Sequence, residues 1–141
     1  MTTPKNLLIV ARNPDTRERL EDLLFGLGYG FRTVANQSEA LMMLQRWHFD
    51  GLLLDVDPPA NRHSEVRRFL RERGMLLPVL LLVKGSDAST AEGLETYQGT
   101  ETVLPQPIKE KELGQWLSQS VGLPGERWSA RTFSIRSGPT S

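Results

Sequence analysis

Short runs of apolar residues that do not alternate with polar ones recur along the chain. The three strongest are residues 7–11 (LLIVA), 52–54 (LLL) and 79–83 (VLLLV). Continuous apolar runs of this length are typical of strands buried on both faces, as in a parallel sheet covered by helices. Two weaker runs, residues 31–35 and 102–104, are predicted to be further strands of that sheet.

Between the runs, apolar residues recur with the spacing of one helix face. The first helix is predicted to begin at Pro14 and to end at Gly28 or Gly30, and Asn36 and Glu39 are spaced like a capping box before the second. The two tryptophans at helical spacing are expected to pack in the core or on a helix face. The five apolar stripes are Leu20, Leu23, Leu24 and Leu27; Ala40, Leu41, Leu44 and Trp47; Val66, Phe69 and Leu70; Ala91 and Leu94; and Leu113, Trp116 and Leu117.

Strands and helices alternate five times in this pattern, which predicts an α/β sandwich around a parallel sheet. The pattern stops near Gly122. Residues 1–121 are therefore expected to form one domain. Residues 122–141, which are rich in Gly, Pro and Ser, are expected to be a linker or a flexible C-terminal tail.

Composition narrows the function classes. The 141 residues contain no cysteine, which excludes a disulfide framework, an iron–sulfur site and a cysteine nucleophile. The 17 Lys and Arg residues balance 17 Asp and Glu residues, so net charge gives no general attraction to nucleic acid or to an anionic membrane. No apolar run approaches the ~20 residues of a membrane span. The chain has no signal-peptide layout, and the interpretation is a cytoplasmic domain.

Asp55 is the polar residue that the strand pattern singles out. In open α/β sheets, ligands bind beyond the carboxyl ends of the strands, and Asp55 directly follows the third strong run. A carboxylate at the end of an apolar strand is costly to bury, so it should face a polar crevice. By position alone, a solvated strand end or a helix cap is the simpler interpretation.

The whole pattern, from about residue 5 to residue 121, resembles the receiver domain of two-component response regulators. The resemblance is carried by residues 8–10 followed by a loop and Pro14, by 50–59 (DGLLLDVDPP), by 78–82 (PVLLL) and by 99–107. It implies a doubly wound (βα)5 flavodoxin-like sandwich with a five-stranded parallel sheet in the order 2-1-3-4-5, and a signalling module rather than an enzyme. In that family an aspartate at the end of the third strand accepts phosphate from a histidine kinase, and Asp55 occupies that place.

The remaining positions of the family's phosphorylation pocket depart from its pattern. The resemblance implies two acidic Mg²⁺ ligands after the first strand, a backbone carbonyl two residues beyond the acceptor, a hydroxyl residue ending the fourth strand, and a lysine before a cis proline. In this chain the corresponding residues are Ala11 and Arg12 (with Asn13 following), Asp57, Val83, Gln106 and Pro107. Only the acceptor aspartate and the proline keep the family's residue type.

These replacements bear first on Mg²⁺, a hard cation that prefers carboxylate oxygens. With both acids gone and Arg12 added, Mg²⁺ is expected to bind weakly or not at all, through Asp55 and the Asp57 carbonyl if anywhere. No other cofactor is expected. The Arg12 guanidinium is permanently charged and is predicted either to form an ion pair with Asp55 in place of a metal or to point to solvent.

Three hypotheses of function follow. The first is a signalling module of a phosphorelay that acts mainly through protein–protein contacts, with phosphorylation of Asp55 impaired or absent. The second is a receiver switch that is still phosphorylated at Asp55 with unusual cation coordination. The third, ranked lowest, is a small-molecule-binding flavodoxin-like domain.

The expected partner is a signalling protein, either a histidine kinase or an output protein, and a homodimer is also allowed. By resemblance, the partner surface is the face of the fourth helix, the fifth strand and the fifth helix, where Tyr97 is a candidate exposed aromatic residue. Neither a membrane nor nucleic acid is expected as a partner of this domain. The basic stretch around the third helix is predicted to be a solvated face; its members are Arg62, Arg67, Arg68, Arg71 and Arg73.

Overall fold

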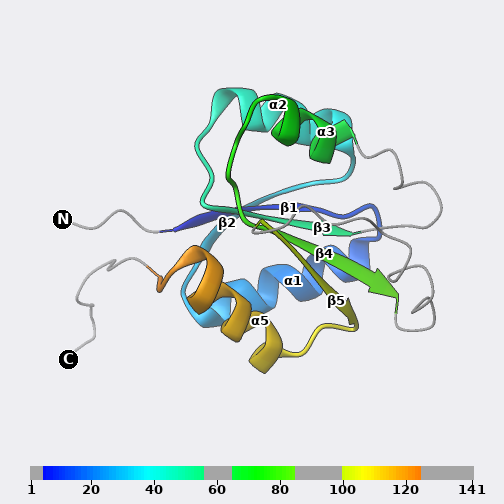
Figure 1. The fold of residues 1–141 in the computed structure, drawn as a ribbon. Helices are drawn as coiled ribbons and strands as arrows, with labels where there is room; N and C mark the ends of the chain where they lie inside the picture. The colour runs from blue at the N-terminus through cyan, green and yellow to red at the C-terminus, as the bar shows by residue number, and fades with distance from the viewer. Residues whose placement is uncertain (1–4, 56–64, 85–99, 125–141) are drawn as a thin grey trace.

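Five parallel strands form one sheet in the order β2-β1-β3-β4-β5 (Figure 1). The computed structural model describes residues 5–55, 65–84 and 100–124. The strands are β1 (Asn6–Val10), β2 (Gly30–Val34), β3 (Gly51–Asp55), β4 (Val79–Lys84) and β5 (Glu101–Gln106). The predicted fold class and strand order are confirmed. Strand β5 extends the strand predicted at residues 102–104 by one residue at its start and two at its end.

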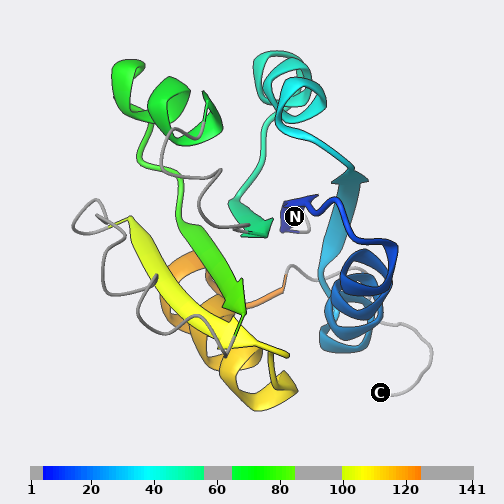
Figure 2. The same ribbon diagram turned by 90° about the vertical axis from the view of Figure 1, so that its right-hand side faces the viewer.

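Helices cover both faces of this sheet, as Figure 2 shows from the side. Helices α1 and α5 lie on one face, and α2 and α3 lie on the other. The helices are α1 (Pro14–Leu27), α2 (Gln37–Arg46), α3 (Glu65–Glu72) and α5 (Glu110–Trp116), which continues into a π-helical turn, η3 (Leu117–Val121). The helix predicted around Ala91 and Leu94 lies outside the described residues.

The predicted helix boundaries follow local capping chemistry. Asn13 precedes α1 and accepts a hydrogen bond from the Asp15 backbone N–H at 2.8 Å. The helix ends at Gly28, whose φ of 88° is left-handed and favours glycine. At α2, Asn36 accepts from the Glu39 N–H at 2.9 Å, while the Glu39 carboxylate accepts in return from the N–H of Ala35, not from that of Asn36.

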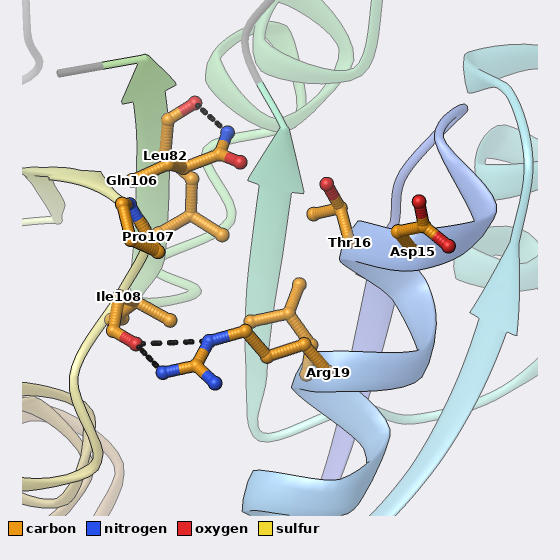
Figure 3. Close-up of a pocket in the computed structure, with 8 residues that line it drawn as sticks. Asp15, Thr16, Arg19, Leu82, Gln106, Pro107 and Ile108 are labelled. Carbon is orange, nitrogen blue, oxygen red and sulfur yellow. Dashed lines mark hydrogen bonds between the residues drawn. The ribbon is translucent and has the colours of Figure 1, made fainter.

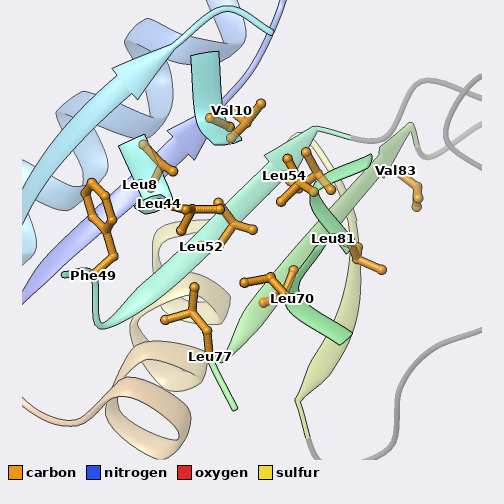
Figure 4. Close-up of a cluster of buried hydrophobic side chains, with 13 residues drawn as sticks. Leu8, Val10, Leu44, Phe49, Leu52, Leu54, Leu70, Leu77, Leu81 and Val83 are labelled. Carbon is orange, nitrogen blue, oxygen red and sulfur yellow. The ribbon is translucent and has the colours of Figure 1, made fainter. Parts of the chain in front are cut away.

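The strands in the middle of the sheet are apolar on both faces because each face has its own core. In β3, Leu52 and Leu54 pack toward α2 and α3, while Leu53 packs toward α1 and α5. Figure 4 shows the first of these clusters, with leucine and valine side chains of three strands meeting Leu44 of α2 and Leu70 of α3. This double burial explains why the three strong runs do not alternate.

The two tryptophans of the predicted apolar stripes behave differently. Trp116 is 5% exposed and belongs to the core beneath α5, as predicted. For Trp47 the prediction is wrong in part, because α2 ends at Arg46 and Trp47 has an extended backbone (φ −128°, ψ 153°). Its ring leaves the apolar stripe of α2, is 50% exposed and lies under the guanidinium of Arg32, 4.7 Å from the ring centre.

The basic stretch on α3 contains one buried member, which corrects the prediction of a fully solvated face. Arg67 is 6% exposed, and its Nε and Nη2 atoms each donate a 2.8 Å hydrogen bond to the carboxylate of Glu101, at the start of β5. Arg68, Arg71 and Arg73 are exposed as predicted, whereas residue 62 lies outside the described part of the chain.

Within the described part of the chain, no helix has both the length and the apolarity needed to cross a bilayer.

Gly51, at the start of β3, allows a close approach of α5 to the sheet. A Cβ there would lie 2.8 Å from Leu7 Cδ2 and 2.9 Å from Val121 Cγ2. Gly51→Ala should therefore lower the free energy of unfolding by about 1–3 kcal/mol through overpacking. Gly26→Ala is the matched control, because nothing lies within 4 Å of its Cβ position and alanine favours the helix by about 0.5–1 kcal/mol. Urea unfolding should show a lower free energy of unfolding for Gly51→Ala and a higher one for Gly26→Ala. Equal changes in the two variants would contradict the overpacking at Gly51.

Tyr29 ties β2 to the end of the described chain and gives the stability a dependence on alkaline pH. Its hydroxyl donates to the Gly122 carbonyl at 2.6 Å, and burial raises the pKa of Tyr29 above its usual 10.0. The folded state therefore favours the neutral phenol, so this contribution is complete below pH 10 and is lost as pH rises through the folded pKa. Tyr29→Phe should show a shallower fall in unfolding free energy above pH 10 in urea titrations. Parallel profiles for the two proteins would refute the assignment.

Candidate functional site

The carboxyl ends of β1, β3 and β5 meet at one edge of the sheet and bring three predicted site residues together. Ala11 directly follows β1, Asp55 ends β3 and Gln106 ends β5. The strand register places Asp55 opposite Leu82 of β4. Ala11, Asp55 and Gln106 are 44 to 95 positions apart in the sequence. They lie at the same edge of the sheet because the parallel strands end together there.

Asp55 and Gln106 are in direct contact. Gln106 Nε2 donates a hydrogen bond to Asp55 Oδ1 at 2.7 Å and a longer one to the Leu82 carbonyl oxygen at 3.3 Å (Figure 3 shows the latter). The amide thus bridges the ends of β3 and β4 from β5. Gln106 donates as a neutral group where the family's lysine would donate as a cation, so it adds no positive charge beside the carboxylate.

The structure does not form the Arg12–Asp55 ion pair. Arg12 is exposed, and among the described residues its side chain has no ion-pair partner. The loop after β1 is held instead by Arg17, whose Nη1 donates to the carbonyl oxygens of Ala11 at 2.9 Å and Arg12 at 3.1 Å. This anchoring fixes the loop with the Arg12 side chain outward. Of the two predicted alternatives for Arg12, the structure therefore has the one that points to solvent.

The end of β1 supplies no carboxylate to the crevice. Ala11 is 1% exposed and its N–H pairs with the Val34 carbonyl at 3.1 Å. The Asn13 side-chain oxygen is already the cap of α1. In residues 5–55, 65–84 and 100–124, no three Asp, Glu or His side chains converge in a way that would hold a metal ion. Asp57, whose carbonyl is the remaining expected ligand, lies outside these residues.

The end of β4 and the start of the β5–α5 connection complete the edge. Val83 is buried and apolar, so it offers no hydroxyl to the crevice. The Gln106–Pro107 bond is cis, as the resemblance implies. Tyr97, the candidate residue of the partner face, lies outside the described residues.

Sequence reasoning missed two arginines that organise this edge. Arg17 holds the β1–α1 loop, and Arg19 reaches from α1 to the β5–α5 connection, where its Nε and Nη2 both donate to the Ile108 carbonyl at 3.2 and 2.6 Å (Figure 3). Basic residues at the N-terminal end of a helix are disfavoured by its dipole, an effect that falls off within the first turn. Arg17, the fourth residue of α1, was therefore a weak signal of a side chain with another role, and nothing in the sequence marked Arg19.

No protein-family model matches the chain, and its curated relatives include proteins named as response regulators and one named as a sensor histidine kinase. Response regulator MprA of Mycobacterium leprae is 35% identical over 108 residues, which cover 76% of this chain and 46% of that protein. The chain spans about half the length of three of the curated relatives that it matches, with 46%, 48% and 46% covered.

Solved structures share the fold over most of the chain. The receiver domain of sensor histidine kinase PA1611 from Pseudomonas aeruginosa, which has a magnesium ion in its active-site cleft, is 25% identical with a TM-score of 0.69 and covers 85% of this chain and 99% of that one. The C-terminus of Escherichia coli RcsC, with its linker region and phosphoreceiver domain, is 28% identical with a TM-score of 0.68 and covers 83% of this chain and 46% of that one.

Proposed function

We propose that this chain, a two-component response-regulator receiver domain by its fold and its sequence relatives, acts mainly through protein–protein contacts, with phosphorylation of Asp55 impaired or absent. The observation that carries the proposal is the 2.7 Å hydrogen bond from the neutral Gln106 amide to the Asp55 carboxylate. Receiver domains are in general signalling modules rather than enzymes, and no catalytic activity is proposed for this one.

The chemistry of phosphoryl transfer supports the impaired state. A carboxylate nucleophile needs cationic groups to neutralise the phosphoryl oxygens as they approach. At this edge Ala11 and Val83 contribute neither charge nor hydroxyl, and Gln106 contributes a neutral donor. Mg²⁺ is therefore proposed to bind weakly or not at all, in contrast to the receiver of PA1611, which is described with magnesium coordinated in its cleft.

The second candidate, a receiver still phosphorylated at Asp55, is favoured by one observation. Asp55 ends its strand partly exposed and keeps the residue type of the acceptor. A phosphodonor could therefore reach it, with cations arranged differently from the family's pattern. The two candidates differ in a single measurable property of Asp55.

A small phosphodonor distinguishes them. The chain, incubated with acetyl phosphate and Mg²⁺, is expected to show no phosphoryl addition by intact mass spectrometry, because Ala11, Val83 and Gln106 replace the charged and hydroxyl residues of the family's pocket. Asp55→Asn reports the background, and Asp15→Asn, an exposed carboxylate on α1, is the matched control. Near-complete modification that disappears only in Asp55→Asn would overturn the first candidate and establish the second.

The proposed partners are signalling proteins: a histidine kinase, an output protein or a second copy of the chain. This rests on the relatives, which include a protein named as a response regulator and one named as a sensor histidine kinase. The proposed contact surface is the face that includes β5 and α5, with Tyr97 as a candidate contact residue. The proposed location is the cytoplasm, and residues 122–141 are proposed to be a linker or tail.

A further inference from the structure

Strand β2 is an open edge of the sheet, because β1 is its one neighbour among the described strands. Alternate residues of an edge strand pair inward in a parallel ladder, and here the Gly30 N–H donates to the Lys5 carbonyl at 2.9 Å. The N–H and C=O groups of Phe31 and Thr33 therefore point away from β1, and they bond no other described residue. The opposite edge, β5, is interrupted by Pro105, which has no N–H. Strand β2 carries no such protection, and an edge of this kind is a template for another strand.

Helix α1 borders this open edge with an aromatic ring and carboxylates. The Thr33 hydroxyl donates to the Glu21 carboxylate at 2.6 Å, so the Glu21 face of α1 lies beside β2. Glu18, Asp22 and Phe25 share that face at helical spacing, and all three are exposed. The Phe25 ring is 78% exposed, although it lies beside the core. Such a surface suits a strand that has apolar side chains on one face and basic side chains near them.

The C-terminal part of this chain contains a segment with that pattern. Residues 131–136, which lie outside the described residues, have the sequence RTFSIR. Phe133 and Ile135 alternate with small polar residues, which is typical of a half-buried strand. Arg131 and Arg136 flank them, so the charge of the segment is opposite to that of the carboxylates on α1.

The described chain ends where this segment could reach β2. A Cβ on Gly28, two residues before β2, would lie 3.5 Å from the Pro124 Cβ. Residues 125–130 can span up to ~20 Å between Pro124 and the segment. A strand that begins there and follows β2 is parallel to it.

The handedness of such a connection is also allowed. Helices α1 and α5 lie on the same face of the sheet. The path from β5 through α5 to the β2 edge crosses this face in the same direction as the path from β1 through α1 to β2. Both crossovers therefore have the same hand, as the rule for parallel sheets requires.

We propose that residues 131–136 pair with β2 as a sixth parallel strand of the same chain, with Phe133 and Ile135 packed against Phe25 on the α1 side. A second copy of the chain is a less favourable occupant. Antiparallel pairing of two β2 strands about a twofold axis would bring two acidic α1 faces together. The pairing closes an edge that other chains could otherwise join. It does not require Asp55 to accept phosphate, so it goes beyond the proposed function.

Hydrogen exchange at the two outward amides of β2, those of Phe31 and Thr33, tests the pairing in the full 141-residue chain by NMR. Both amides are expected to exchange at least about tenfold more slowly than in a double variant, Phe133→Asp with Ile135→Asp, because a paired amide exchanges only when its strand opens. The Gly30 amide, which is bonded to β1, should exchange equally in both proteins. Rapid exchange of the outward amides in the full chain, or equally slow exchange in the double variant, would overturn the proposal.

A matched control separates the segment from the rest of the tail. Ser137→Asp with Thr140→Asp adds the same two charges after the segment and should keep the slow exchange of the outward β2 amides. Loss of protection in this control as well would mean that added charge alone, and not the strand, explains the result. Sedimentation should show a monomer. A dimer whose protection at these amides disappears on dilution would assign the edge to a second copy and overturn the proposal.

Phe25→Ala tests the α1 side of the proposed contact. The substitution removes an exposed ring and favours the helix, so it should leave the domain folded. Exchange at the outward β2 amides should become several-fold faster, because the segment loses its apolar contact. Leu76→Ala, at an 84% exposed leucine before β4, should leave this exchange unchanged. Equal effects of the two substitutions would contradict packing of the segment against Phe25.

Discussion

Glu101→Gln is expected to lower the free energy of unfolding by about 3–5 kcal/mol, because it leaves the charge of Arg67 buried without its counterion. Both 2.8 Å hydrogen bonds of the Arg67 guanidinium to Glu101 involve the carboxylate, and the Glu101 side chain is only 2% exposed. An amide can accept only one of these bonds and carries no charge. Urea unfolding monitored by circular dichroism gives the measurement.

Two further variants show that the loss comes from the unpaired charge. Replacing both partners by apolar residues of similar volume, in Arg67→Met with Glu101→Leu, should recover most of the stability, since removing a buried pair entirely is often neutral. Arg68→Met, an exposed neighbour on α3, should change stability by less than about 0.5 kcal/mol. If Glu101→Gln were as mild as Arg68→Met, the pair would not hold α3 to β5.

The Arg67–Glu101 pair also marks the limit of what the sequence reveals about the fold. Strand positions and helix caps were predictable because they depend on neighbouring residues, as in the Asn36–Glu39 cap. The pair joins residues 34 positions apart, and it requires the register of α3 against β5. Without that register, Arg67 is predicted to be solvated like the other arginines of its helix.

Strand β5 was underestimated for a related reason. It begins with Glu101 and contains Pro105 and Gln106, none of which is typical of a buried strand. The sheet order places β5 at an edge, where a proline is tolerated because its missing N–H would face outward. Local propensity therefore gives only the apolar middle of the strand, and the topology explains its ends.

The sequence predicted which residues lie at the site, but not which of them contact one another. The resemblance placed Asp55 and Gln106 at the carboxyl ends of two strands of one sheet, and the structure joins them across β4 by a hydrogen bond between residues 51 positions apart. The direction of a long side chain on a loop is set by its surroundings, so the sequence left Arg12 with two alternatives. The deciding contacts come from Arg17, which holds the backbone of that loop.

Restoring the two missing acids should restore Mg²⁺ binding. Ala11→Asp with Arg12→Asp restores the acidic residue type at both positions after β1 and removes a cation, and the Mg²⁺ affinity is expected to rise by about 100-fold or more. Ala11 is 1% exposed, so a carboxylate there is costly without a metal, and the double variant should be less stable than the parent chain in EDTA.

Mg²⁺ should then recover that stability, by about 2.7 kcal/mol when its concentration is 100 times the dissociation constant. Thermal unfolding with Mg²⁺ and with EDTA measures this, and the unmodified chain should show little difference between the two. The matched control is Gln45→Asp with Arg46→Asp, which adds acids at the exposed end of α2 and should not respond to Mg²⁺. An unmodified chain stabilised as strongly as the double variant would mean that Ala11 and Arg12 do not weaken the site. A double variant that ignores Mg²⁺ would mean that these positions do not face Asp55.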